Sequence, residues 1–250
     1  MKTFVISMKD SVERRTAVQL ALDKENIKFD FFDGVNIKKS NSDIVLKYDS
    51  GKTLKAKGYT LTDTELGCFA SHIGLWKKCV SLNEPILILE DNFKINKRLL
   101  PFIEYGNKHI EKLGVLKFGA SAYAKYIHIA EVTSNTALVK YKKGVCGGSS
   151  YMISPVAAKK YLIMSESFFE PVDNFMDKEW LTDQPLYTFH PHVISRSSCK
   201  SVIGNRKDKS KHSYFGKICA ELYRNYLRFR HFVYNNNFNK NISQIRLELK

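Results

Sequence analysis

The chain has 250 residues, 44% of them hydrophobic and 12% aromatic, which is enough to bury a full core and argues against a disordered protein. Its formal net charge of +15 suits anionic partners such as nucleic acid, an acidic membrane surface, phosphorylated glycolipids or nucleotide-sugar diphosphates. The five cysteines are scattered and form no pair with metal-site spacing, which argues against a zinc-finger protein and favours a reducing compartment.

The N-terminal region is predicted to open with a strand followed by a helix. Residues 3–6 are β-prone, and residues 11–24 place apolar side chains among charged ones in helical rhythm. Residues 29–32 give a second strand that stops at Asp33, directly before a glycine. Residues 36–57 are polar and rich in Lys, Ser and Asp, so we expect a surface loop there.

A long amphipathic helix is predicted from residue 62 onward. Thr62 and Glu65 match a capping box, in which each side chain satisfies a free backbone amide at the helix start. The helix ends before Pro85, and the apolar run of residues 86–89 is typical of a central strand buried on both faces. The apolar side chains of the helix repeat at spacings of three and four and define its buried face: Leu66, Phe69, Ala70, Ile73, Trp76 and Val80.

The following segments continue this alternation of strands and helices. Residues 115–118 and 136–141 resemble strands, and residues 144–149 form a glycine-rich loop. Residues 151–153 give a short strand before Pro155 opens a helix. The pattern favours an α/β fold with a mostly parallel central sheet flanked by helices.

The C-terminal segment is more basic than the rest of the chain. From Asn205 onward it holds eleven Lys or Arg residues against three acids. A basic amphipathic helix is therefore predicted. It would dock on anionic lipid or pack its apolar face on the preceding domain, and a combination of the two is favoured. Its large apolar side chains recur at helical spacing: Phe215, Ile218, Leu222, Tyr226, Phe229 and Val233.

The N-terminal sequence lacks the apolar core and cleavage site of a signal peptide. No stretch of the sequence approaches the ~20 apolar residues of a spanning helix. We therefore expect a cytoplasmic protein, associated peripherally with the inner face of a membrane.

Two carboxylates follow the most apolar predicted strand. Glu90 and Asp91 stand where strand ends of an open α/β sheet face the ligand crevice, and carboxylates there can hold a metal ion that bridges phosphates. Acids after a strand also serve simply to solvate a turn, so this pair alone is a weak signal.

The order of the sequence motifs resembles glycosyltransferase family 25, which includes lipooligosaccharide galactosyltransferases. The likeness covers about residues 3–204. Each block is only moderately specific, but seven blocks in the same order are hard to obtain by chance. The blocks are VISMKDSVERR, FDFFDGV, LTDTELGCFASHIGLWKKC, PILILEDNF, GGSSYMISPVAAKKY, EPVDNF and KSVIG.

The resemblance implies a GT-A-like nucleotide-sugar fold over residues 1–204, followed by a basic helical tail over residues 205–250. It also implies a UDP-sugar donor and a divalent ion, commonly Mn²⁺, held near a DxD-like motif. Here that motif would be Glu90-Asp91-Asn92, with Asp91 and Asn92 as ligands. Many relatives carry Asp at the third position, and an amide oxygen binds a hard cation more weakly than a carboxylate does.

A transfer of this kind needs a base that takes the proton of the acceptor hydroxyl. Asp173, after the turn at Pro171, is the preferred candidate, and Asp183 and Glu170 are its rivals. An aspartate near a helix start is also a common capping residue, so the two interpretations of Asp173 stand about equal.

Donor binding is expected from residues near the first two strands. Ser7 and Asp91 belong to blocks that the family resemblance assigns to the nucleotide site, and Arg14 is favoured over Arg15 as a contact for the diphosphate. Asp33 could bind uridine or ribose hydroxyls, although a turn-forming aspartate would look the same. Glu90 is also expected to bind the nucleotide-sugar donor.

Further candidates lie on the long helix and in the glycine-rich loop. Ser71 and His72 are expected to line the donor pocket, and Gly147 to allow the backbone to approach the sugar closely. Glu65, Cys68 and His72 share a helix face, but the sequence shows no second ligand pair for zinc, so Cys68 is interpreted as a packing residue. His190 is a candidate metal or phosphate neighbour, although such a histidine is more often structural.

The combined prediction is an inverting hexosyltransferase that moves galactose from UDP-galactose to a terminal sugar of lipooligosaccharide or lipopolysaccharide. Two alternatives stay open. One is a catalytically inactive family member that acts as a scaffold, which Asn92 suggests. The other is a basic nucleic-acid-binding protein, although no helix-turn-helix, RRM or KH pattern is visible and no nucleic-acid partner is expected.

Overall fold

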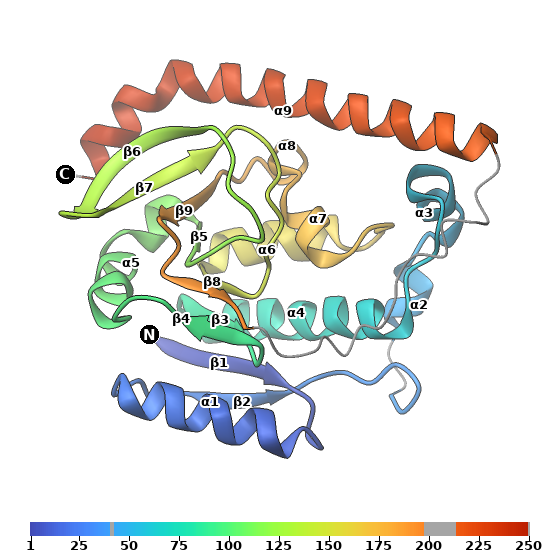
Figure 1. The fold of residues 1–250 in the computed structure, drawn as a ribbon. Coiled ribbons are helices and arrows are strands. Elements are labelled where there is room, and N and C mark those ends of the chain that lie inside the picture. The colour runs from blue at the N-terminus through green and yellow to red at the C-terminus, as the bar shows by residue number, and fades with distance from the viewer. Residues whose placement is uncertain (41–42, 198–213, 250) are drawn as a thin grey trace.

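The computed structural model describes residues 1–40, 43–197 and 214–249. A central eight-stranded sheet with the order β2-β1-β3-β8-β5-β9-β7-β6 carries helices on both faces (Figure 1). The KSVIG block and the expected boundary between residues 204 and 205 lie outside the described residues. The strands are β1 (Lys2–Ser7), β2 (Asp30–Asp33), β3 (Ile86–Glu90), β5 (Val115–Lys117), β6 (Tyr126–Thr133), β7 (Thr136–Tyr141), β8 (Ser150–Ile153) and β9 (Leu186–His190), with β4 (Phe93–Ile95) and β10 (Ile194–Arg196) pairing separately.

The sheet is mixed, with one predominant direction. β2, β1, β3, β5, β9 and β6 run one way, while β8 and β7 are antiparallel to their neighbours. The strands thus share one predominant direction, as expected of a mostly parallel sheet. However, β8 lies between β3 and β5 and is antiparallel to both. As a result, the carboxyl ends of β1 and β3 and the start of β8 meet at the same edge.

The long helix α4 (Asp63–Leu82) packs on one face of the sheet. Thr62 and Glu65 form the predicted capping box, and the predicted apolar face is buried apart from the half-buried Val80. Ile86 and Ile88 of β3 contact the core on this face, whereas Leu87 and Leu89 contact the core on the other. The other helices are α1 (Val12–Lys24), α2 (Ile44–Lys47), α3 (Ser50–Lys57), α5 (Leu100–Leu113), α6 (Pro155–Met164), α7 (Val172–Met176), α8 (Glu179–Thr182) and α9 (Tyr214–Glu248).

The prediction of a loop over residues 36–57 is wrong for its second half, which forms α2 and α3. The side chain of Asp49 caps α3 by accepting from the backbone N–H of Lys52, and Gly58 ends the helix with a φ of 77°. The helix is anchored by Thr53, which is fully buried and donates to the carbonyl of Phe169 at 2.6 Å. Caps and one tertiary contact thus form a helix that has little apolar periodicity of its own.

The predicted C-terminal helix is present as α9, which crosses the molecule from α3 to β6 (Figure 1). It docks through Asn235 and Phe238, both buried, and Lys140 of β7 donates to Asn235 Oδ1 at 2.7 Å. Among the described residues, no helix combines the length and the apolarity needed to cross a bilayer.

The apolar stripe predicted on α9 faces outward, not toward the domain. The packing alternative for this stripe is therefore wrong, because the helix docks through other residues. Five described side chains of the stripe, at spacings of four, four, three and four, are 38–63% exposed: Ile218, Leu222, Tyr226, Phe229 and Val233. The side chain of Phe215 lies outside the described residues.

Candidate functional site

Two cavities share a wall at the edge where β1 and β3 end. The larger one, of about 500 Å³, lies between the end of β1, the start of α1, the loop after β2 and the start of α4. The smaller one, of about 90 Å³, lies among the loops that follow β5, precede β8 and surround the start of α7. The residues that line both cavities are Cys68, Glu90, Asn92 and Arg196. The larger cavity has the size of a small-molecule site, and the smaller one opens beside it.

Asp91 is held at the wall of the larger cavity by two other predicted donor residues. Ser7, the last residue of β1, donates its hydroxyl to Asp91 Oδ2 at 2.7 Å. Arg14 of α1 forms an ion pair with Asp91 Oδ1 at 3.0 Å. The sequence blocks that hold these three residues therefore converge on one polar cluster, because β1 and β3 are adjacent parallel strands.

Asn92 supplies a buried acceptor atom at this site. Its Oδ1 is buried and has no hydrogen-bond partner among the described residues, although the residue lines both cavities. A buried carbonyl oxygen without a partner costs about 1–3 kcal/mol, and a bound cation removes that cost. The oxygen atoms of Asp91 and Asn92 therefore fit a hard divalent ion such as Mn²⁺ or Mg²⁺.

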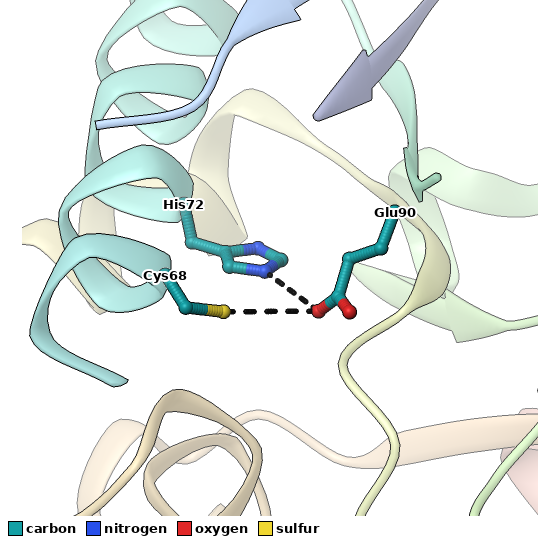
Figure 2. Close-up of side chains that lie close together, drawn as sticks. All are labelled: Cys68, His72 and Glu90. Carbon is teal, nitrogen blue, oxygen red and sulfur yellow. Dashed lines mark hydrogen bonds and ion pairs between the residues drawn. The ribbon is translucent and has the colours of Figure 1, made fainter. Parts of the chain in front are cut away.

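Glu90 ends a hydrogen-bond chain that begins in the core. Trp76 donates to the hydroxyl of Tyr151 at 2.9 Å, and that hydroxyl lies 2.8 Å from Nδ1 of His72. The other ring nitrogen, Nε2, lies 3.4 Å from Oε1 of Glu90 (Figure 2). Burial raises the pKa of Glu90, but the hydrogen bond from His72 and the charge of Arg196 outweigh it, so the net pKa is lowered.

This arrangement corrects the expectation for His72. The imidazole is fully buried and lies behind Glu90, so it does not line either cavity. His72 holds the carboxylate through one ring nitrogen, and its other ring nitrogen is held in turn by the hydroxyl of Tyr151. His72 is thus a positioning residue for Glu90.

Asp173 lines the smaller cavity from the first turn of α7. Burial and the nearby charge of Asp177 raise the pKa of its carboxyl group. Its Oδ1 accepts from the backbone N–H of Asn174 at 2.9 Å, but Pro171 occupies the N-cap position, so Asp173 is not the helix cap. A carboxylate with a raised pKa in a cavity is suited to general-base catalysis.

The two rivals of Asp173 lie elsewhere. Glu170 is buried between Lys57 and Lys178 and forms ion pairs with both. Asp183 follows α8, is exposed, and adopts a left-handed backbone conformation with a φ of 45°. Neither residue lines the cavities, so the geometry favours Asp173.

Ser71 and Gly147 shape the walls of the cavities. Ser71 accepts from the N–H of Val35 at 2.9 Å and donates to the carbonyl of Gly67 at 2.8 Å, which ties the loop after β2 to α4. Gly147 has a φ of 89°, and a Cβ there would lie 2.8 Å from the Cα of Ala120. The glycine is therefore required by the contact between two loops that line the smaller cavity.

Asp33 and His190 are not among the residues that line the cavities. Asp33 is exposed and paired with Arg15, which also donates to the carbonyls of Ser7 and Met8. Nδ1 of His190 lies 3.1 Å from the hydroxyl of Tyr141, within an aromatic cluster that also contains Tyr123, Tyr126 and His192. His190 thus lies apart from Asp91 and Asn92.

Arg196 was not predicted from the sequence, and Cys68 was predicted only as a packing residue. Arg196 lies on the three-residue strand β10, too short to give a recognisable pattern, and reaches the wall that the two cavities share. Cys68 contacts the core, as expected, but it also lines both cavities. Its position one helical turn before His72 was the available signal.

Comparison with known proteins identifies the sequence relatives. The family model described as "Glycosyltransferase family 25 (LPS biosynthesis protein)" matches residues 1–176. The "Lipooligosaccharide biosynthesis protein lic2B" of Haemophilus influenzae is 30% identical over 166 residues, which cover 63% of this chain and 60% of that protein. The "Lacto-N-neotetraose biosynthesis glycosyltransferase LgtE" of Neisseria meningitidis is 28% identical over 236 residues, 84% of this chain and 82% of that protein.

The matches differ in how much of each relative they include. The alignments span 60% of lic2B and 60% of a second Haemophilus influenzae protein, described as a "Putative glycosyltransferase". Among solved structures, the crystal structure of A197 from STIV matches with a TM-score of 0.36 and 13% identity, over 75% of this chain and 81% of that one. A structural likeness of this size carries no argument about function.

Proposed function

Because this chain belongs to glycosyltransferase family 25, we propose that it transfers a hexose from a nucleotide donor to a sugar of lipooligosaccharide or lipopolysaccharide. The finer proposal is a GT-A-type enzyme that uses UDP-galactose and inverts the anomeric centre. One observation supports it most: an acidic motif stands between a cavity of about 500 Å³ and a smaller cavity that Asp173 lines, and it includes an amide oxygen with no partner in the described part of the chain.

The larger cavity suits the nucleotide half of the donor. Its lining combines polar residues such as Asn36 and Thr64 with apolar ones such as Val35, from the end of β1, the loop after β2 and the N-terminal turn of α4. Arg14 adds positive charge to this cavity, and Arg196 adds it at the wall that the two cavities share. A diphosphate that lies across this wall would meet both guanidinium groups and the oxygen ligands of the motif.

A divalent ion, Mn²⁺ in our proposal, would be held by Asp91 and Asn92. When bound, it would neutralise the charge that develops on the leaving diphosphate. Arg14 now pairs with Asp91, so ion binding would free the guanidinium for a phosphate oxygen. Ser7 would keep Asp91 oriented through its contact with Oδ2.

The smaller cavity would receive the acceptor hydroxyl. Asp173 accepts the hydroxyl proton while the acceptor oxygen forms its bond to the anomeric carbon. The bond from that carbon to the diphosphate oxygen breaks on the opposite side, and the electron pair leaves with the nucleotide. Displacement by a single base in this way gives inversion.

A thermal-shift experiment tests the donor assignment. A ligand that binds only the folded state raises the melting temperature, by an amount that grows with the ratio of its concentration to Kd. We expect UDP and UDP-galactose to raise it with Mn²⁺ and to lose most of that effect in EDTA. No shift with any uridine nucleotide at saturation would overturn the assignment and favour a scaffold. A shift with oligonucleotide alone would favour the nucleic-acid alternative.

We further propose that α9 places the enzyme on an anionic membrane surface, where a lipid-anchored acceptor would lie. The same stretch of the helix carries Arg224 and Arg228, whose exposed side chains form ion pairs with Glu221. Apolar side chains enter the acyl boundary while basic ones stay at the headgroups, so the pattern matches an interfacial helix. The firm docking of α9 through Asn235 and Phe238 leaves this stripe available.

Removal of two stripe side chains should weaken vesicle binding. The double variant Leu222→Ser/Phe229→Ser loses two large apolar groups that are 63% and 61% exposed, so the fold should be unaffected. We expect sedimentation with phosphatidylglycerol vesicles to weaken by about tenfold or more. Leu20→Ser on α1, at a position that is 67% exposed, is the matched control and should bind normally. Unchanged binding of the double variant would contradict the proposal.

A further inference from the structure

Cys68, His72 and Glu90 form a compact group of metal-ligating side chains at the wall between the two cavities (Figure 2). One ligand atom from each residue lies within 4.8 Å of the other two. The sulfur of Cys68 is 3.8 Å from Oε1 of Glu90, and Nε2 of His72 is 3.4 Å from the same oxygen. The cysteine and histidine come from successive turns of α4, and the glutamate comes from the end of β3.

The N···O and S···O distances in this group are close to the distances between ligand atoms in a tetrahedral zinc site. Bonds of about 2.0 Å to nitrogen and oxygen and about 2.3 Å to sulfur give edges of about 3.3 Å for N···O and about 3.5 Å for S···O. The N···O distance exceeds its tetrahedral value by about 0.1 Å and the S···O distance by about 0.3 Å. The sulfur of Cys68 and the ligand nitrogen of His72 lie within 4.8 Å of each other, so rotation of the Cys68 side chain would bring all three atoms around one ion.

The surroundings of the group suit a site with three protein ligands. Nδ1 of His72 faces the hydroxyl of Tyr151, so when Nε2 binds a metal the ring proton moves to Nδ1 and is donated to that oxygen. His72 is fully buried, whereas Cys68 and Glu90 line both cavities. The fourth coordination position would consequently open toward the cavities, where water or a substrate group can bind.

We propose that Cys68, His72 and Glu90 bind a zinc-class cation. The thiol separates this site from the oxygen ligands of Asp91 and Asn92, because thiolate and imidazole select softer ions than Mn²⁺ or Mg²⁺. Binding converts the thiol of Cys68 to a thiolate and releases one proton. Because the thiolate is the ligand form of cysteine, affinity should fall as the pH is lowered.

Cobalt substitution tests the site without any assay of transfer. The metal-free full-length protein, titrated with Co²⁺, should develop a thiolate-to-cobalt charge-transfer band and the intense visible bands of tetrahedral cobalt. Added Zn²⁺ should abolish both sets of bands at one equivalent. Tyr151→Phe should weaken Co²⁺ affinity by about 10–100-fold, because it removes the partner of Nδ1.

Matched cysteine variants locate the ligand. Cys68→Ser should remove the charge-transfer band, whereas Cys219→Ser, at a half-buried cysteine of α9, should retain it. Circular dichroism of each variant confirms the fold. The proposal is overturned if the wild-type protein gives no thiolate band, or if the band survives in Cys68→Ser. In either case the three side chains form only the hydrogen-bond chain described above.

Discussion

Asp173→Asn should reduce kcat of the proposed transfer by about 10²–10⁴-fold, the usual contribution of a positioned general base. The amide fits the same space but cannot accept the acceptor proton. Because Asp173 lines the smaller cavity and not the larger one, binding of the nucleotide should survive. Initial rates with UDP-galactose and a lipooligosaccharide acceptor, together with a UDP thermal shift, measure the two properties separately.

The pH profile gives a second readout of the same residue. Only the ionised carboxylate is a base, and burial raises the pKa of Asp173. The acidic limb of kcat/KM should therefore lie at a higher pH than for an ordinary aspartate, with the rate increasing through the raised pKa and then levelling. Asp183→Asn, at the exposed rival, should keep both rate and profile. A larger loss in Asp183→Asn than in Asp173→Asn would reverse the assignment.

Asp91→Asn should lower kcat/KM by about 10²-fold or more and remove the stimulation by Mn²⁺. The variant loses the negative charge that pairs with Arg14 and accepts from Ser7, and with it the stronger of the two proposed ion ligands. Loss of one strong electrostatic contact to developing charge costs about 10²–10³ in rate. Rates measured over a range of Mn²⁺ concentrations test both parts of this prediction.

A neighbouring aspartate provides the control for Asp91. Asp23 lies near the end of α1, is exposed, and accepts a hydrogen bond from the side chain of Gln19 at 2.7 Å. Asp23→Asn should leave the rate and the Mn²⁺ response unchanged. If Asp91→Asn kept a normal Mn²⁺ response, Asp91 would hold Arg14 in place without binding an ion.

The elements with the strongest local signals were predictable from sequence. The capping box at Thr62 and the three- and four-residue periodicity after it identified α4 almost to its ends. The apolar run before Glu90 identified β3, which is buried on both faces. By contrast, α3 depends on Asp49, Gly58 and a buried hydroxyl, and such a helix has no apolar period to detect.

The candidate site was predictable where sheet topology alone determines it. Ser7 and Asp91 meet because β1 and β3 are parallel neighbours, and their ends necessarily share an edge. His72 could not be placed in the same way, since its role depends on hydrogen bonds to Tyr151 and Glu90 over 79 and 18 residues of sequence. Spacing along a helix gives the face of a residue but not the partners it meets.

The two cavities are lined mostly by different parts of the chain. The larger cavity is lined by residues up to Asn92 and by Arg196, whereas most of the smaller one comes from loops between Gly119 and Arg196. Under the proposed function, substitutions in those later loops would change which sugar is accepted and would leave the cavity proposed for the nucleotide unaltered. In that case an ancestral enzyme could acquire a new acceptor through substitutions in these loops alone, while its descendants keep the same donor.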